Sequence, residues 1–436
     1  MTAAAQVLQG LFSAAGLEDP YRYYAELRRH GPVSLIGGSS PYAAVVTGYD
    51  AVNQVLRDPR VRVTDDVFAD EQAGPGWREH PVLAALHNSM MYSNGDRHTR
   101  ARQLLQQVFT PRRVQELQPA MVRQIGQLID GLADRLAADG EADFMTEFAY
   151  LLPSSVVAAL LGIPEHDLAW FRPRVERIVE FLDVTGKTDE VLRRANDATV
   201  ELSDYYHRLI AERRRSPSDD LISRLVSAEH DVSDDELVCN LLVLFNASFV
   251  TTIHLLGNGM WLLLDRPELR SCPPEQFVEE VLRYESPVQF VARYADDVLE
   301  IAGTTIPPKE VFLVMLGAAN RDPANFPEPD RFDPARFARD PYTHTAERRA
   351  GGNMRWGAAP TDGAAGAGGE NSRPLSFGVG PHFCLGASLA RAEAQLAFPL
   401  LLQRFPGLRK VRPPVRYPQQ FLRGFESMPV EVCDAP

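Results

Sequence analysis

Cysteine is scarce in this chain, with only four among its 436 residues: Cys239, Cys272, Cys384 and Cys433. So few cysteines provide no disulfide framework, and no two of them have the spacing of a zinc site. We expect Cys239, Cys272 and Cys433 to be small buried hydrophobic residues. Cys384 differs from them because it lies within a dense motif.

The chain also lacks an excess of basic residues and any long hydrophobic run. Its 58 acidic and 45 basic side chains give a net charge of −13, whereas binding to nucleic acid requires a basic face. The first twenty residues have neither the basic start nor the apolar core of a signal peptide. The longest apolar stretch, at residues 241–245, is far too short to span a membrane. We expect a cytoplasmic, monomeric protein with no nucleic acid or membrane partner.

Helical patterning dominates what is present. Apolar residues recur at spacings of three and four in residues 21–30, 50–58, 100–109, 112–138, 191–215, 236–264 and 275–285. Runs rich in β-branched residues are shorter and fewer, at residues 41–47, 298–301, 311–316 and 429–432. With 45% apolar residues, the pattern predicts a single domain over residues 1–436, mainly α with small β-sheets.

One segment, residues 340–373, departs from this composition. It is rich in glycine and alanine and has few apolar anchors. Such a segment buries too little surface to offset the entropy lost on ordering it. Because motif-bearing sequence continues on both sides, we expect a mobile insertion within the domain.

The densest motif covers residues 376–391 and reads SFGVGPHFCLGASLAR. Gly380 and Gly386 bracket Cys384, and a helical pattern follows at once. A cysteine just ahead of a helix has its thiolate stabilised by free N–H groups and by the helix dipole. Glycines allow the backbone to approach a flat ligand closely. An aromatic residue such as Phe377 can shield the sulfur from water.

This motif resembles the haem-binding signature of the cytochrome P450 family, in which a phenylalanine, two glycines and a histidine or arginine accompany the cysteine. All five fixed positions are matched, by Phe377, Gly380, His382, Cys384 and Gly386. The plain alternative is a glycine-rich turn around a buried cysteine. The resemblance implies the P450 fold and a haem b cofactor whose iron is bound by the Cys384 thiolate, with the other four residues in contact with the haem.

Glu280 and Arg283 are three residues apart on the predicted helix 275–285, which places them on one face. Surface pairs at this spacing are common and contribute little. In the family, however, the matching pair is buried beneath the haem and joined by an arginine from a later loop. Arg336 is the expected third member and Arg331 the alternative. Their implied role is structural support of the cysteine loop.

The two propionates of haem need cations or hydrogen-bond donors. By resemblance, four residues provide them: His98, Arg102, Arg293 and His382. Each of these, taken singly, is more often a solvated surface residue. Nearby lies a basic cluster of Arg97, Arg100, Arg112 and Arg113. The family docks its electron donor on this side, so we expect the cluster to steer an acidic ferredoxin, although charge runs are usually solvated faces.

The predicted helix 236–264 resembles the family helix that crosses the oxygen-binding side of the haem. Thr251 matches the family threonine, whose hydroxyl is expected to hold water beside the iron. The alternative is a hydroxyl that bonds back to its own helix. Ser248 replaces the usual glycine, and Val250 replaces the usual acid.

The missing acid affects proton delivery. Cleavage of the O–O bond requires two protons, which a carboxylate normally helps to relay. Valine cannot do this. We expect Ser248, ordered water or a substrate hydroxyl to substitute, in a specialised biosynthetic enzyme.

The resemblance implies hydroxylation or epoxidation of a hydrophobic small molecule, such as a secondary-metabolite intermediate, with O2 and with electrons from a separate ferredoxin and its reductase. Two alternatives remain open, namely an oxidase that couples bonds or rings without inserting oxygen and a non-catalytic haem sensor. By resemblance, apolar segments that would face the substrate contain Met90, Met91, Phe245, Phe249, Val288, Val291, Phe421 and Leu422. Any of these could equally be ordinary core residues.

Overall fold

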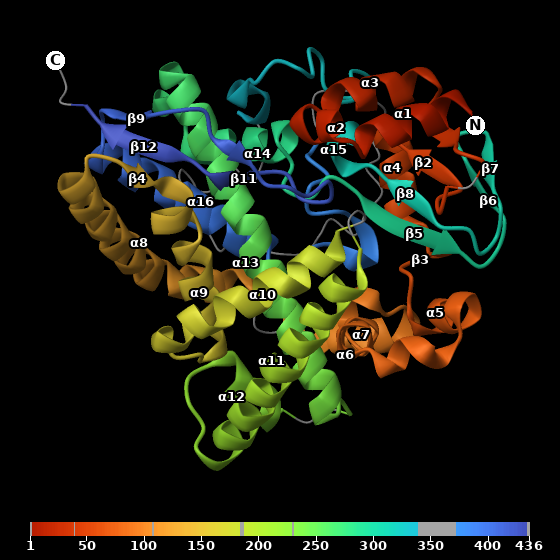
Figure 1. Ribbon diagram of the computed structural model, residues 1–436, viewed down its shortest axis with the longest axis horizontal. Coiled ribbons are helices and arrows are strands. Elements are labelled where there is room, and N and C mark those ends of the chain that lie inside the picture. The colour runs from red at the N-terminus through yellow and green to blue at the C-terminus, as the bar shows by residue number, and fades with distance from the viewer. Residues whose placement is uncertain are drawn as a thin grey trace, which may run out of the picture.

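The computed structural model describes residues 2–38, 40–106, 109–183, 187–228, 231–338 and 372–433. Figure 1 shows one long helix, α13 (Asp234–Asp265), running through the middle of the molecule with other helices gathered along it. The largest β-sheet and the N-terminal helices lie together at one side. The expected insertion at residues 340–373 lies outside the described residues, except for its last two.

The central helix α13 begins at a well-formed cap. Ser233 accepts a hydrogen bond from the N–H of Glu236, and acidic residues in the first turn favour the positive end of the helix dipole. By length and composition α13 could cross a membrane, but 72% of its most apolar window is buried inside the molecule. A helix that is apolar on every side and covered by protein is typical of a core.

All seven segments predicted to be helical form helices. Besides α13 they are α3 (Tyr21–Arg29), α4 (Tyr49–Arg57), α7 (Gly95–Gln106), α8 (Pro111–Asp139), α11 (Asp189–Arg215) and α14 (Pro274–Tyr284). The predicted helical pattern after Cys384 is α16 (Ala387–Arg404). Helix α7 begins at Gly95 rather than at residue 100, because its polar first turn carries no hydrophobic period.

The structure also contains helices that the pattern does not predict. They are α1 (Ala3–Leu11), α2 (Ala14–Glu18), α5 (Asp66–Ala73), α6 (Pro81–His87), α9 (Leu151–Leu161), α10 (Leu168–Leu182), α12 (Leu221–Ser227) and α15 (Leu316–Ala319). Helix α9 shows one reason. It is buried on nearly all sides, so no alternation of apolar and polar faces marks it in the sequence.

The largest sheet has five short strands in the order β1-β2-β8-β5-β3. They are β1 (Val33–Leu35), β2 (Ala44–Val46), β8 (Phe312–Val314), β5 (Val291–Ala295) and β3 (Val61–Arg62). Strands β2 and β8 are parallel, and the other neighbours are antiparallel. Two of the predicted strands, 41–47 and 311–316, therefore meet at the centre of this sheet.

Smaller sheets complete the fold. Strand β6 (Leu299–Ile301) pairs with β7 (Thr304–Ile306), and β12 (Pro429–Val432) lies between β4 (Ala142–Asp143) and β9 (Leu408–Lys410). Strand β10 (Val415–Arg416) pairs with β11 (Phe425–Ser427). The prediction of a mainly α protein with small β-sheets is confirmed.

Candidate functional site

The cysteine loop joins a short 3-10 turn, Gly380–His382, to the start of α16. The loop is closed by a hydrogen bond of 3.0 Å from the Cys384 N–H to the Phe377 carbonyl. Cys384 lies deep within the molecule, yet its side chain is exposed. A buried location with an accessible side chain means that the sulfur faces an internal space.

Two opposing effects act on the Cys384 thiol. Burial raises its pKa, because the protein interior disfavours a charged thiolate. The N–H groups of Gly386 and Ala387 and the charges of Arg391 and Arg102 lower the pKa. These two N–H groups lie at the start of α16, so the predicted stabilisation of a thiolate by a helix start is present.

Glycine is needed at the two positions that bracket Cys384 for different physical reasons. Gly380 has φ of 75°, and a Cβ at this position would lie 2.2 Å from the Leu56 carbonyl oxygen. Glycine is therefore required at position 380 because the loop lies close to α4. The sequence predicts a different reason, the close approach of the backbone to a flat ligand. A Cβ on Gly386 would lie 3.9 Å from the Cys384 sulfur. Glycine here leaves the space beside the sulfur open, as a ligand bound to that sulfur would require.

The structure brings together the four residues expected to bind propionates. The rings of His98 and His382 are 4.1 Å apart between centroids, and Arg102 donates to the Phe383 carbonyl at 2.8 Å. Burial lowers the pKa of His98 to about 4, that of His382 to about 2 and that of Arg293 to about 10.

This group of donors has no anionic partner in the part of the chain that the structure describes. Neither Arg102 nor Arg293 forms an ion pair there, and the buried His98 Nε2 has no hydrogen-bond partner. Interior cations without counter-charges are costly. Two carboxylates of a bound ligand would supply the missing charge, so these residues fit a haem with its two propionates.

Beneath the cysteine loop, Glu280 and Arg283 form an ion pair with no exposed surface. Arg283 Nε and Nη2 donate to the two Glu280 carboxylate oxygens at 2.7 and 2.8 Å. Arg336 lies 3.6 Å from Glu280 Oε1, whereas Arg331 is 62% exposed and pairs with Glu328. The structure thus places the expected Arg336, and not Arg331, as the third member.

Asn320 and Ser376, which the sequence did not single out, connect this ion pair to the cysteine loop. Arg283 Nη1 donates to the Asn320 carbonyl at 3.0 Å. The Asn320 side chain accepts from the Leu375 N–H at 2.7 Å and donates to the Ser376 hydroxyl at 2.8 Å. Buried asparagines of this kind leave no periodic signal in a sequence, so only the fold reveals the connection.

Helix α13 has three accessible residues within about one turn of an otherwise buried stretch. Between Asn240 and Met260 the residues that are not buried are Ala247, Ser248 and Thr251. The Thr251 hydroxyl donates to the Ala247 carbonyl at 3.0 Å, which is the alternative geometry considered for this threonine. No hydrogen bond from the Ser248 hydroxyl is found within the described residues.

The structure separates the eight expected substrate-facing residues into two groups. Five have accessible surface: Met90, Met91, Val288, Val291 and Phe421. Phe245, Phe249 and Leu422 are only 2, 2 and 3% exposed. Phe249 packs edge-on against Tyr150, which immediately precedes α9, and Phe245 packs against Phe171 of α10. Phe245 and Phe249 are therefore core residues between helices, which is the alternative considered for this set. The helical period does not reveal which neighbour covers a face.

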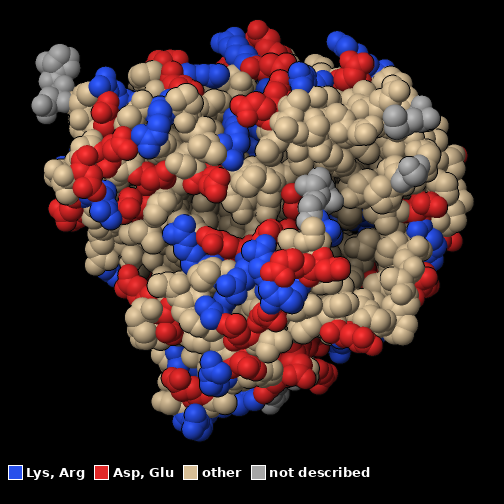
Figure 2. Space-filling model, in the orientation of Figure 1, with Lys and Arg blue, Asp and Glu red and all other residues tan. Residues whose placement is uncertain are grey.

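The expected basic cluster is largely neutralised. Arg97 lies 3.3 Å from Asp66, and Arg112 and Arg113 lie 3.1 and 3.3 Å from Glu116. Within the described residues only Arg100 of this cluster lacks an ion pair. Figure 2 shows acidic and basic side chains similarly interspersed over the face toward the viewer.

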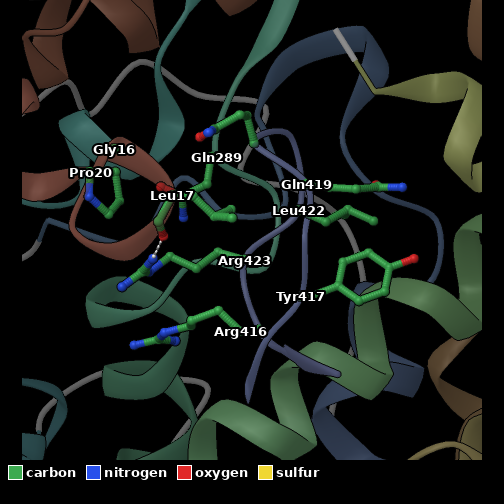
Figure 3. A pocket seen from close by; sticks show the side chains of 11 residues that line it. Gly16, Leu17, Pro20, Gln289, Arg416, Tyr417, Gln419, Leu422 and Arg423 are labelled. Carbon is green, nitrogen blue, oxygen red and sulfur yellow. Dashed lines mark hydrogen bonds between the residues drawn. The ribbon is translucent and has the colours of Figure 1, made fainter. Parts of the chain in front are cut away.

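A separate cavity of about 10 Å³ lies between the N-terminal segment and the β10–β11 hairpin (Figure 3). Arg416 and Arg423 point the same way at its edge, and Arg423 donates to the Leu17 carbonyl at 3.2 Å and to Glu285 at 2.6 Å. The volume suits about one water molecule. This cavity is therefore part of a buried ionic network and is too small for a substrate.

Comparisons with known proteins agree with the geometry. The family model described as Cytochrome P450 matches residues 7–271 and 275–430. Cytochrome P450 monooxygenase PikC of Streptomyces venezuelae is 34% identical over 429 residues, covering 94% of this chain and 91% of PikC. The 6-deoxyerythronolide B hydroxylase of Saccharopolyspora erythraea is 33% identical, covering 95% of this chain and 96% of its own.

Solved structures show the same fold. P450BioI, solved in complex with an acyl carrier protein ligated to hexadec-9Z-enoic acid, superimposes with a TM-score of 0.81 at 32% identity and covers 96% of this chain and 100% of its own. Together with the match of the family model along almost all of the chain, this establishes the relationship. The chain belongs to the cytochrome P450 family, the oxidoreductases that hold haem b through a cysteine thiolate.

Proposed function

We propose that Cys384 is the axial ligand of the haem iron and that the enzyme hydroxylates or epoxidises a hydrophobic small molecule, a secondary-metabolite intermediate. The observation that carries this proposal is the position of the Cys384 sulfur, which is accessible deep inside the molecule at the start of α16. Haem, when bound, supplies the activation of O2. His98, Arg102, Arg293 and His382 would hold its propionates, and Phe377, Gly380 and Gly386 would shape the loop beneath it.

Within the site, Ser248 and Thr251 are the proposed proton-handling residues. Both are accessible on α13, but only the Ser248 hydroxyl is free of a hydrogen bond to its own helix in the described part of the chain. The free Ser248 hydroxyl supports a role for this residue in binding water and passing protons where Val250 replaces the usual acid. If Val250→Glu greatly increased coupled turnover of the native substrate, the hypothesis that serine, water or a substrate hydroxyl replaces the usual acid in a specialised enzyme would be wrong.

The substrate pocket would be lined by the accessible apolar residues Met90, Met91, Val288, Val291 and Phe421. Apolar walls with few polar groups suit a hydrophobic small molecule. The relatives PikC and 6-deoxyerythronolide B hydroxylase support a substrate from secondary metabolism.

Electrons would come from a ferredoxin and its reductase, in a cytoplasmic, monomeric enzyme that acts without nucleic acid or membrane. Steering of an acidic ferredoxin would depend mainly on Arg100, since its three basic neighbours are paired with acids. Arg100→Glu is expected to slow electron delivery without changing substrate affinity. An unaltered rate would remove this docking hypothesis.

The replacement of the usual acid by Val250 is the observation behind a second candidate, an oxidase that couples bonds or rings without oxygen insertion. Product analysis under 18O2 separates the two reactions, since only the monooxygenase product carries the label. A haem sensor, the third possibility, would bind haem but would not consume electrons when substrate is added.

The first experiment is the absorption spectrum of the reduced protein with carbon monoxide. We expect the Soret band at the long wavelength typical of thiolate ligation, its loss in Cys384→Ala and its retention in the control Cys433→Ala. A short-wavelength band in the unmutated protein would overturn the assignment of the iron ligand.

A further inference from the structure

Two neighbouring glutamates of α14 are buried and bind arginines from different parts of the chain. Glu280 pairs with Arg283 of the same helix. Glu279, only 2% exposed, pairs with Arg391 on α16, 112 residues away in the sequence. Since Asn320 and Ser376 connect the first pair to the start of the cysteine loop, one turn of α14 holds the segments on both sides of Cys384.

Arg391 makes two kinds of contact at once. Its Nη2 donates to Glu279 Oε2 at 3.0 Å, and its Nε donates to Glu279 Oε1, so the ion pair is bidentate. Its guanidinium centre lies 4.5 Å from the centroid of the Phe377 ring. A planar guanidinium can bind a carboxylate through its edge and stack on an aromatic ring through its face, whereas the ammonium group of lysine cannot do both.

Phe377 is also the residue whose carbonyl accepts the Cys384 N–H at 3.0 Å. Arg391 is therefore connected to Cys384 through Phe377, by one ring contact and one hydrogen bond. In the other direction, Arg391 is anchored in α16, whose first N–H groups face the sulfur. The Arg391 side chain is 16% exposed and that of Glu279 3%, so water screens this pair of charges only weakly.

We propose that Glu279 and Arg391 are positioning residues for the iron ligand, which hold Phe377 against the cysteine loop and set the balance of charge beside it, and so the reduction potential of the iron. This inference rests on the proposed role of Cys384. A positive charge near the iron favours the ferrous state, and a negative charge favours the ferric state. The pair is neutral as a whole, so neutralising either partner changes the local charge by one unit of known sign.

The test compares Arg391→Gln, Glu279→Gln and the double variant in the haem-loaded full chain, by spectroelectrochemical titration. Arg391→Gln should shift the equilibrium toward ferric iron and Glu279→Gln toward ferrous iron, each roughly tenfold, which corresponds to about 59 mV for one electron. The double variant should lie near the unmutated protein. Shifts of the same sign in both single variants, or no shift, would overturn the proposal, because a purely structural defect has no reason to depend on the sign of the removed charge.

A conservative variant guards against loss of folding. Arg391→Lys keeps the charge but loses the fork and the stacking on Phe377, so we expect an almost unchanged potential. Conversion of the reduced carbon monoxide complex from the long-wavelength to the short-wavelength form should be at least severalfold faster. Arg423→Lys is the matched control, because Arg423 forms another buried ion pair, with Glu285. This variant should change neither the reduction potential nor the conversion rate.

Failure of this inference can be told apart from failure of the proposed function. If the unmutated protein lacks the long-wavelength band, Cys384 is not the ligand. If the band is present and depends on Cys384, but the Arg391 and Glu279 variants leave potential and conversion rate unchanged, only the positioning role is wrong.

Discussion

The Thr251 hydroxyl donates a hydrogen bond to the Ala247 carbonyl, one turn earlier on α13, at 3.0 Å. The neighbouring Thr252 does the same to the Ser248 carbonyl, also at 3.0 Å. Both threonine hydroxyls are thus committed to their own helix. Of the hydroxyl groups in this stretch, that of Ser248 is the one available to water.

This relationship predicts the effect of Ser248→Ala. Removal of the free hydroxyl should weaken proton delivery, so that roughly tenfold more hydrogen peroxide is released per product formed, which is less than a general acid–base group typically contributes. Peroxide and product are measured together with electron consumption. Thr252→Val, at a buried position, is the control and should leave the ratio unchanged. An unchanged ratio in Ser248→Ala would exclude the serine from proton delivery.

The buried pair of Glu280 and Arg283 predicts a large loss of stability on mutation. Glu280→Gln leaves the Arg283 guanidinium buried without its counter-charge, which should lower the free energy of unfolding by about 3–5 kcal/mol. Chemical denaturation of the haem-loaded protein measures this loss. Arg331→Ala, in an exposed pair with Glu328, should cost about 0–1 kcal/mol. Equal losses in the two variants would contradict the assigned burial.

Gly380→Ala should be much more costly than the same change at Gly303. Both glycines have positive φ, 75° and 77°, which costs a residue with a Cβ about 1–2 kcal/mol. At Gly380 the Cβ would also lie 2.2 Å from the Leu56 carbonyl oxygen, whereas at Gly303 nothing lies within 4 Å. We expect a difference of at least about 2 kcal/mol in unfolding free energy. A difference near zero would show that the loop can move away from α4 freely.

Glu393 predicts a dependence of stability on pH. Burial raises the pKa of this carboxyl to about 8 from an ordinary value of 4.5, and its Oε2 has no hydrogen-bond partner. Between these two values the folded protein holds a proton that the unfolded chain releases, so the contribution of Glu393 to stability falls as the pH rises from about 4.5 to 8.

Glu393→Gln removes this dependence. The difference in unfolding free energy between the variant and the unmutated protein should increase in favour of the variant as the pH rises from 5 to 8, by up to about 4 kcal/mol. Denaturation at several pH values measures the difference. Glu431→Gln, at a partly exposed carboxylate, is the control. A difference that does not vary with pH would mean that the buried carboxyl is already ionised.

Features that depend on neighbours along the chain could be predicted from the sequence. The loop around Cys384 and its helix start, the shared face of Glu280 and Arg283, and the seven helices all follow from residue spacing, because helical geometry fixes which side chains lie on one face. The family motif added the choice of Arg336 as the third partner.

Features that depend on what packs against a face could not be predicted in this way. Phe245 and Phe249 share one face of α13, but the fold covers their rings with Phe171 of α10 and with Tyr150 just before α9. The sequence showed the basic cluster, but two of its acidic partners come from elsewhere in the chain, Asp66 from α5 and Asp219 from the loop before α12.

The pair of Glu279 and Arg391 is the clearest case. Neither residue carries a periodic signal, and they are 112 positions apart. The packing of α14 against α16 brings them together, because burial of a carboxylate is tolerated only where a cation with matching geometry also arrives. Spacing along the chain determined which residues could share a helical face, and tertiary packing determined which charges, rings and hydroxyls meet there.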